Sequence, residues 1–182
     1  MGVASVFLYA PGAALSLAEL CAARIDGHLV EVGDAYIPAD AVETAALRAA
    51  SLAAVVPADC AVTHVAAAWI HGAVPSPPVR LAVQRTRAGR RRTDQSLRVE
   101  YRDSLIAPAD LVVIGGLPVT TPTRTLADLA RAGDDDACRA AAQLMAGTGC
   151  ADPDAARRWL WTHGSLPHSG SALRLLARLR TT

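Results

Sequence analysis

Glycine and proline break this sequence into short segments, and the order of those segments constrains the fold. An alanine-rich stretch over residues 42–56 stops at Pro57, and a second helical stretch over about residues 62–71 stops at Gly72. Alanine inflates the hydrophobic share of 52%, whereas aromatic residues make up only 4% of the chain. We therefore expect short helices and a helix-rich core that contains few large side chains.

The first 40 residues predict a small unit of their own. Residues 3–9 form an apolar run rich in β-formers. Ser16 and Glu19 have the spacing of a capping box, which predicts the start of a helix. Short apolar runs on either side of Gly33-Asp34 predict a β-hairpin over residues 29–37.

The remainder of the chain, residues 41–182, predicts a helix-rich domain with a small β-sheet. Thr121 is suited to be a helix N-cap because Pro122 follows it as a first helical residue. Gly115-Gly116 indicates a tight turn inside an apolar run. We expect strands over residues 79–84, 97–101 and 111–119, and helices over 42–56, 62–71, 122–131, 137–145, 153–163 and 169–179.

The composition excludes several kinds of chemistry. The chain has no lysine, because all 18 of its basic residues are arginine. A Walker A phosphate loop, a Schiff-base enzyme and the common restriction-type nuclease core each need a lysine. The four cysteines have neither C-x-x-C nor zinc-finger spacing, which indicates small buried side chains in a reducing compartment.

The opening residues predict neither export nor membrane insertion. Residues 1–17 contain no basic residue, and Pro11 interrupts them after about ten positions, which is too short for a span. We therefore expect a cytoplasmic protein without a membrane partner.

Charge is distributed unevenly along the chain. Residues 1–56 carry two arginines against six acidic residues, a net charge of −4, whereas residues 80–102 carry eight arginines against two acidic residues, a net charge of +6. Guanidinium groups on a glycine-containing loop can reach several phosphates at once, which predicts a nucleic-acid contact. The alternative is a solvated hairpin tip whose charge serves solubility. The candidate nucleic-acid ligands between the two strands are Arg85, Arg87, Arg90, Arg91 and Arg92.

The other polar residues favour structural roles. His64 and His71 lie two turns apart on one helix, and two histidines alone make a poor metal site, so packing or capping is the better interpretation. Arg124 and Asp128 have the spacing of an ion pair on a helix face. The last helix, with its arginines on one side, is typical of an amphipathic helix packed on the body. Because no nucleophile elbow is present, we expect no enzyme and no catalytic residue. We also expect no metal and no cofactor.

Four segments of the chain form an ordered set of motifs: SLAELCAARIDGHLVEVGDAYIPAD (16–40), THVAAAWIHG (63–72), PPVRLAVQRTRAGRRR (77–92) and LPVTTPTRTLADLAR (117–131). Together they resemble the AbiEi-type antitoxins of abortive-infection, type IV toxin–antitoxin systems, in their actinobacterial form. The resemblance covers about residues 15–131 and is a pattern of strand, cap and small-residue positions. It implies a winged-helix N-terminal piece, an α/β C-terminal domain, repression at the operon's own promoter, and antagonism of a nucleotidyltransferase-like toxin.

One departure from the family pattern concerns the N-terminal unit. A complete winged helix has two helices before its hairpin, the second of them basic, but only residues 17–25 fit that place here. The resemblance assigns DNA reading to Arg24 and His28, although Arg24 is the only arginine of this unit and acidic residues surround it. Charge therefore favours the arginines between residues 85 and 92 as the DNA contact.

The prediction is an α+β (α/β) protein with two parts: a reduced winged-helix-like unit over residues 1–40 and an antitoxin-like domain over residues 41–182. Its leading function is that of a non-enzymatic antitoxin and transcriptional regulator that binds promoter DNA through the arginine-rich hairpin loop. It would antagonise a nucleotidyltransferase-like toxin, directly or indirectly. The alternative is a protein-interaction module that docks a partner, which could be the toxin, without binding DNA. A hydrolase that uses a histidine or serine is the third and weakest hypothesis.

Overall fold

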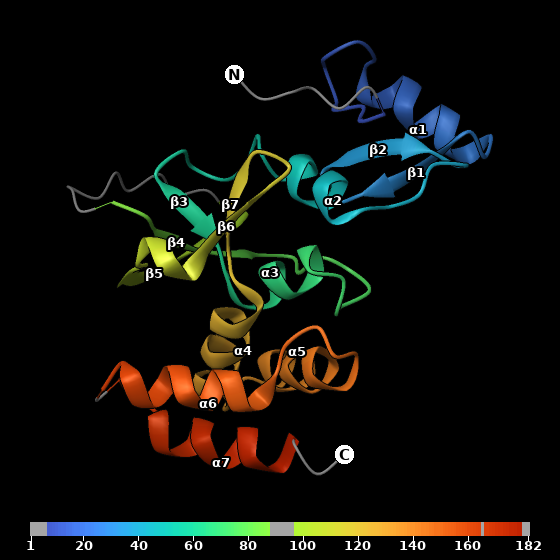
Figure 1. Ribbon diagram of the computed structural model, residues 1–182. Coiled ribbons are helices and arrows are strands. Elements are labelled where there is room, and N and C mark those ends of the chain that lie inside the picture. The colour runs from blue at the N-terminus through green and yellow to red at the C-terminus, as the bar shows by residue number, and fades with distance from the viewer. Residues whose placement is uncertain (1–6, 88–96, 165, 180–182) are drawn as a thin grey trace.

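A computed structural model describes residues 7–87, 97–164 and 166–179, and residues 1–6, 88–96, 165 and 180–182 lie outside the described part. The fold is α+β, as the sequence predicts: a small helix-and-hairpin unit at the N-terminus, a five-stranded sheet, and a layer of C-terminal helices beneath the sheet (Figure 1). No described helix has the length and apolar character to cross a membrane.

The N-terminal unit forms as predicted from its capping box and hairpin signals. Helix α1 (Leu17–Ile25) begins where the Ser16 amide donates to Glu19 Oε2 at 2.8 Å and Ser16 Oγ accepts from the Glu19 amide at 3.3 Å. Strands β1 (Leu29–Val32) and β2 (Ala35–Pro38) pair in antiparallel register. Leu20, Leu29 and Tyr36 form a small apolar cluster between the helix and the hairpin.

The expectation for the run 3–9 lies mostly outside the described residues, because only residues 7–9 are described. Within these, Tyr9 forms an isolated antiparallel bridge with Tyr36. A second expectation for this part of the chain is corrected. The expected helix over 42–56 is the shorter α2 (Ala45–Ser51). Alanine propensity alone would extend that helix, but the chain turns after it and thereby places Leu52 and Val56 in the main core.

The main sheet has the order β5-β4-β3-β7-β6. Strand β3 was not predicted, because a three-residue run next to a helix shows no alternation. Gly115, at φ +56°, turns β6 into β7, and a Cβ there would meet the Ala46 carbonyl oxygen at 2.3 Å, so the turn packs directly on α2. The strands are β3 (Cys60–Val62), β4 (Leu81–Arg85), β5 (Val99–Leu105), β6 (Leu111–Ile114) and β7 (Leu117–Thr120).

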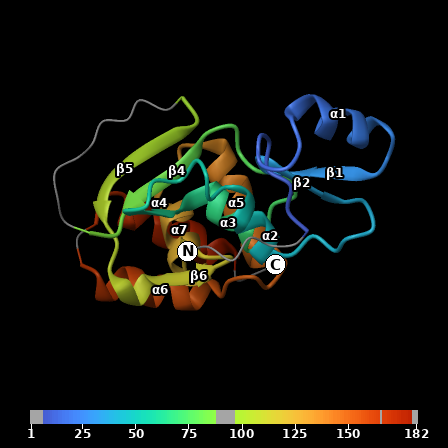
Figure 2. The same ribbon diagram turned by 90° about the horizontal axis from the view of Figure 1, so that it is seen from above.

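The C-terminal helices begin at the predicted caps. Thr121 Oγ1 accepts from the Arg124 amide at 3.3 Å, and Asp152 Oδ1 accepts from the Asp154 amide at 2.9 Å. Helix α4 lies at the centre of the layer and contacts the other four of these helices, as the two ribbon views also show (Figures 1 and 2). The helices are α3 (His64–Ile70), α4 (Pro122–Arg131), α5 (Asp136–Gly147), α6 (Pro153–Thr162) and α7 (Ser169–Leu179), with a 3₁₀ turn at Pro108–Asp110.

Two large apolar clusters form the core. One joins the sheet to α2 and α3 around Trp69, which is the largest fully buried side chain. The other joins α3 through α7 with alanine, leucine and Met145, so small side chains fill most of the helix contacts. The four cysteines are free thiols. The predicted shortage of large core residues is therefore confirmed in the described residues.

Candidate functional site

The arginine segment, defined here as residues 85–92, begins at the end of β4. Arg85 is half-buried and Arg87 is exposed, while Arg90, Arg91 and Arg92 lie outside the described residues. Thr86 anchors the start of the segment, because its amide and its hydroxyl both donate to the Asp59 carbonyl oxygen, at 2.9 and 3.0 Å. The prediction that this segment contacts nucleic acid stays a prediction.

The segment does not connect a hairpin, contrary to the sequence-based expectation. Strands β4 and β5 pair in parallel, with Leu81 opposite Val99. A hairpin needs antiparallel strands, whereas a parallel pair needs a connection that returns along the full strand length. The sequence pattern contained no sign of strand direction, so the hairpin was assumed from proximity alone.

The N-terminal unit and the arginine segment lie in different places. Arg24 on α1 and His28 before β1 are both exposed. Both ribbon views place α1 on the side of the molecule away from β4 and β5 (Figures 1 and 2). The structure therefore does not bring Arg24 and His28 together with Arg85 and Arg87.

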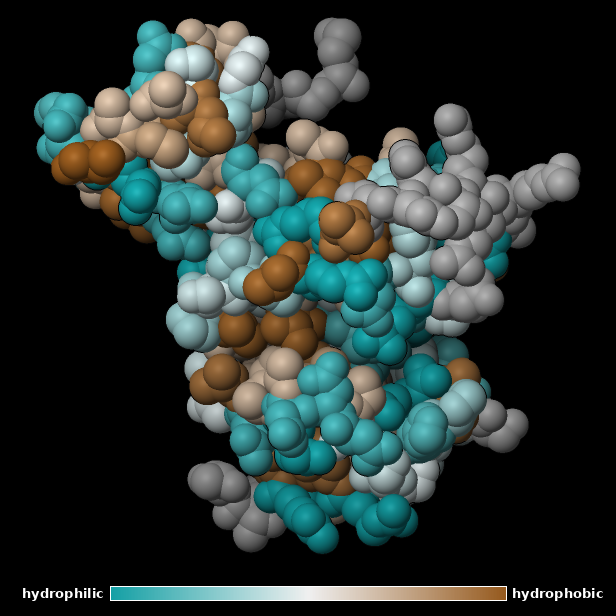
Figure 3. All heavy atoms as spheres, turned by 180° about the vertical axis from the view of Figure 1, so that it is seen from behind, coloured by the Kyte–Doolittle hydropathy of each residue, from teal (hydrophilic) through white to brown (hydrophobic). Residues whose placement is uncertain are grey.

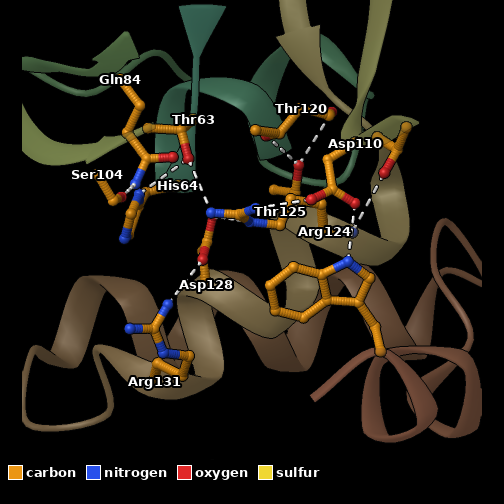
Figure 4. Close-up of polar contacts among 12 residues, drawn as sticks. Thr63, His64, Gln84, Ser104, Asp110, Thr120, Arg124, Thr125, Asp128 and Arg131 are labelled. Atoms are coloured by element: carbon orange, nitrogen blue, oxygen red, sulfur yellow. Dashed lines mark hydrogen bonds and ion pairs between the residues drawn. The ribbon is translucent and has the colours of Figure 1, made fainter. Parts of the chain in front are cut away.

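A buried polar network connects the sheet to the C-terminal helices (Figure 4). Arg124 donates from Nε to Asp128 Oδ2 at 2.7 Å and from Nη1 to Asp110 Oδ2 at 2.8 Å. Asp110 Oδ1 accepts from Trp159 Nε1 at 2.7 Å, and the Arg124 guanidinium lies 4.6 Å from the centre of that indole ring. Asp128 also receives a hydrogen bond from Arg131 at 3.2 Å.

The ion pair expected between Arg124 and Asp128 is present. Both residues are buried, at 5% and 1% exposure, so the pair lies inside the fold. Burial acts to lower the pKa of Arg124, and the carboxylates of Asp128 and Asp110 outweigh it, so its pKa lies above the usual value. Asp110 and Trp159 cannot be assigned to this network from the sequence, because each comes from a different element and no local spacing connects them to Arg124.

The network continues from Asp128 to a buried histidine. Thr63 Oγ1 donates to Asp128 Oδ2 at 3.4 Å and lies 3.0 Å from His64 Nδ1. Since the single hydroxyl proton of Thr63 is used for Asp128, His64 Nδ1 donates and its Nε2 is left as an acceptor. Burial lowers the pKa of His64, so the ring is neutral at pH 7.

The histidines have packing and capping roles, as predicted. His64 is buried, and His71 Nε2 lies 2.7 Å from the Thr120 carbonyl oxygen, so it joins α3 to the end of β7. Burial lowers the pKa of His71 despite that hydrogen bond. No group of three possible metal ligands occurs within the ranges that the structure describes.

The chemistry of this network is structural. Thr63 is fully buried and cannot reach a substrate, and Asp128 is held between two arginines. Burial also raises the pKa of the Cys60 thiol to about 11 and that of Cys138 to about 12, so neither is a thiolate at neutral pH. The described network therefore joins two layers of the fold and offers no activated nucleophile.

The fold and this network define a class: an α+β protein in which buried arginine and aspartate side chains fix a helical layer against a small sheet. The AbiEi antitoxin C-terminal domain matches residues 58–148, which are half of the 182 residues. The chain belongs to the AbiEi antitoxin family, as its sequence motifs predict.

The fold is also similar to that of a protein of known structure. The crystal structure of the RV2827C protein from Mycobacterium tuberculosis superimposes with a TM-score of 0.50 at 19% identity, over 89% of this chain and 63% of that chain. The chain thus spans 63% of the length of that protein, and the likeness shows a shared fold. No curated protein matches the sequence.

Proposed function

We propose that this antitoxin is a cytoplasmic, non-enzymatic transcriptional regulator that holds promoter DNA against the arginine segment. The observation that carries the proposal is the position of this segment. Residues 85–92 lie inside the matched antitoxin domain, within a stretch, residues 80–102, whose net charge is +6. Arginine neutralises phosphate groups and releases counterions, which supplies most of the free energy of non-specific DNA binding.

The pairing of β4 with β5 supports an extended contact. β5 is an edge strand of the sheet, and Arg85 and Val99 lie at opposite ends of the parallel pair. Four residues of strand separate these ends, a distance of roughly 13 Å along the strand. The arginines of the segment therefore belong to a connection with well-separated ends, which suits several phosphates better than one.

The family relationship supports the remaining parts of the proposal. The N-terminal unit, residues 1–40, serves as a reduced winged helix, and residues 41–182 form the antitoxin domain. This domain antagonises a nucleotidyltransferase-like toxin, either by contact or through repression of its gene. Arg24 and His28 make a secondary DNA contact in this scheme, since both are exposed on the N-terminal unit.

Fluorescence anisotropy with a labelled duplex from the chain's own promoter tests the DNA contact. The double variant Arg91→Ala/Arg92→Ala should bind at least tenfold more weakly than the wild type. The charge-matched control is Arg157→Ala/Arg158→Ala on α6, which should bind within twofold of the wild type. Equal weakening by both variants would show a general charge effect and remove the arginine segment from the proposal.

A second candidate function is that of a docking module that binds a partner protein and no DNA. The N-terminal unit favours it for two reasons. The unit is acidic, and the apolar Leu17 and Ile25 on α1 are exposed by 56% and 79%. Co-expression with the product of the neighbouring gene separates the two functions. The docking function would be established by two results together. The wild type should co-purify with the partner while Leu17→Ser/Ile25→Ser does not, and the wild type should not shift promoter DNA.

A further inference from the structure

A continuous groove lies beside α7, on residues to which the proposed DNA contact assigns no role. Two hollows, of about 430 and 210 Å³, share Arg131, Asp134 and His168 in their walls and so adjoin each other. The wider hollow also has His64, Gln84 and Ser104 in its wall, and the narrower one has Arg139, Arg174 and Arg178. Together their volume suits a small organic ligand. We call this hollow the α7 groove.

Backbone strain within the described residues is concentrated on the same groove. His64 and His168 are the two described residues other than glycine that have a positive φ, of 53° and 63°. Both line the wider hollow. A side chain in this region of the backbone map costs free energy, and such residues cluster at sites that hold a ligand.

The narrow end of the groove is strongly basic. Its wall contains four arginines and a histidine against the single carboxylate of Asp134. Arg131 and Arg139 are held by described partners, through Asp128 and Asp136. Among the residues that the structure describes, Arg174 and Arg178 form no ion pair and no side-chain hydrogen bond, although both are exposed on α7.

The arrangement of Arg174 and Arg178 suits an anion. The two residues are four apart on one helix, where like charges repel each other and destabilise the helix. Ser171, three residues before Arg174, lies on the same face and also lines this end. A phosphate group placed here would receive charge-assisted hydrogen bonds and remove the repulsion.

The wide end of the groove has a different chemistry. Ser104 is exposed, and the neutral His64 ring, which is 7% exposed, is part of the wall. Gln84 is 3% exposed and donates to Ser104 Oγ at 2.6 Å, while its own Oε1 has no described partner. Arg102 likewise has a buried Nε without a partner. The wall of this end also contains Asp128, Asp134 and Asp135 against Arg102 and Arg131, so its charges nearly balance. Donors and acceptors therefore both line this end, which suits a polar, uncharged organic group.

We propose that the α7 groove binds a small phosphorylated ligand, with its phosphate on Arg174 and Arg178 and its polar organic part beside Ser104 and His64. Figure 3 shows that hydrophilic residues predominate over the lower, helical half of the face opposite to that of Figure 1. No residue of the arginine segment is among those that line the groove. The proposal therefore does not rest on the proposed DNA contact.

Isothermal titration of the full chain with inorganic phosphate, adenosine and the four ribonucleoside 5′-monophosphates tests this proposal. At least one monophosphate should bind more tightly than inorganic phosphate, and adenosine should bind more weakly than its monophosphate. The variant Arg174→Ala/Arg178→Ala should weaken the binding of phosphate and of monophosphate at least tenfold. Arg157→Ala/Arg158→Ala removes the same charge from α6 and should leave both affinities within twofold.

A second variant separates the two ends of the groove. Ser104→Leu should weaken binding of the monophosphate at least fivefold and leave the affinity for inorganic phosphate unchanged. If phosphate and monophosphate bind with equal affinity, and if Ser104→Leu alters neither affinity, the proposal of an organic ligand is overturned. Equal behaviour of the α7 and α6 double variants, or binding of a 5′-phosphorylated oligonucleotide without binding of any mononucleotide, would overturn the proposal as a whole. Thermal unfolding of each variant establishes that it is folded.

Discussion

Arginine has opposite roles in two regions of this molecule. Arg124 is buried between Asp110 and Asp128 and lies against the Trp159 ring, so its charge is neutralised by the protein itself. Arg174 and Arg178 on α7 are exposed, and within the described ranges no carboxylate pairs with them. The first arginine joins parts of the fold, whereas the other two are available to a ligand.

In a chain that has no lysine, every cationic role of a basic side chain falls to arginine. The residue type alone therefore does not indicate the role of an arginine, which follows from its burial and its partners. A buried, paired guanidinium should determine stability, because its removal leaves carboxylates in a medium that solvates them poorly. An exposed, unpaired guanidinium should leave stability nearly unchanged and affect binding.

The largest effect is expected for Arg124→Met. This change leaves Asp110 and Asp128 buried without their main cation, so the free energy of unfolding should fall by about 3–5 kcal/mol. Urea denaturation followed by circular dichroism measures this fall. A loss below about 1 kcal/mol, the range of exposed ion pairs, would show that Arg124 contributes no more to stability than an exposed arginine does.

A smaller effect is expected for Trp159→Phe. Phenylalanine keeps an aromatic side chain, although a smaller one, and removes the indole N–H that donates to Asp110 Oδ1. An unsatisfied buried acceptor costs about 1–3 kcal/mol, and the same urea titration applies. Trp161→Phe on the same helix is the control, because Trp161 is 64% exposed and its loss should change stability very little.

The next effect concerns pH. Burial lowers the pKa of His64 and of His71 in the folded chain, so at pH 5–6.5 the unfolded state binds more protons than the folded state. The stability that the two neutral histidines contribute is therefore fully present above a pH of about 6.5. As the pH is lowered below this value, the free energy of unfolding falls by at most about 1.4 kcal/mol per pH unit for each histidine.

Unfolding titrations of the wild type and of His64→Gln between pH 7.5 and 5 measure this dependence. The variant should show a shallower fall, because one of the two contributing histidines is absent. His163→Gln is the exposed control and should follow the wild type. Identical slopes for the wild type and His64→Gln would show that His64 is not held neutral by the fold.

The smallest effect on stability is expected for Arg174→Ala/Arg178→Ala. Removal of a like-charge pair at this spacing should change the free energy of unfolding by less than about 0.5 kcal/mol, in the stabilising direction. The thermal midpoint at low salt measures it. A clear destabilisation would show that these arginines support the fold and are not reserved for a ligand.

Local signals predicted the helical elements well. Thr121 and Pro122 fixed the start of α4, and Ser16 with Glu19 fixed the start of α1, because a cap is a property of a few neighbouring residues. The run 111–119 with its Gly115-Gly116 turn became β6 and β7 for the same reason. Family membership could also be predicted, since the motif order extends over most of the chain.

Features that depend on distant residues could not be predicted. Strand β3 is short, and its place between β4 and β7 follows from packing. The parallel direction of β4 and β5 is a property of the whole sheet, so the arginine segment was wrongly interpreted as a hairpin. Asp110 reaches Arg124 only after the 3₁₀ turn at Pro108–Asp110 and α4 come together. The positive φ of His64 leaves no sign in the sequence.

The salt dependence of promoter-DNA binding measures how many phosphates the arginine segment holds. Each phosphate contact contributes about −0.9 to the slope of log affinity against log salt concentration. We expect Arg90→Ala/Arg91→Ala/Arg92→Ala to make the slope for own-promoter DNA less steep by about two to three. A slope equal to that of the wild type would contradict the proposed DNA contact, because the arginine segment would then hold no phosphate.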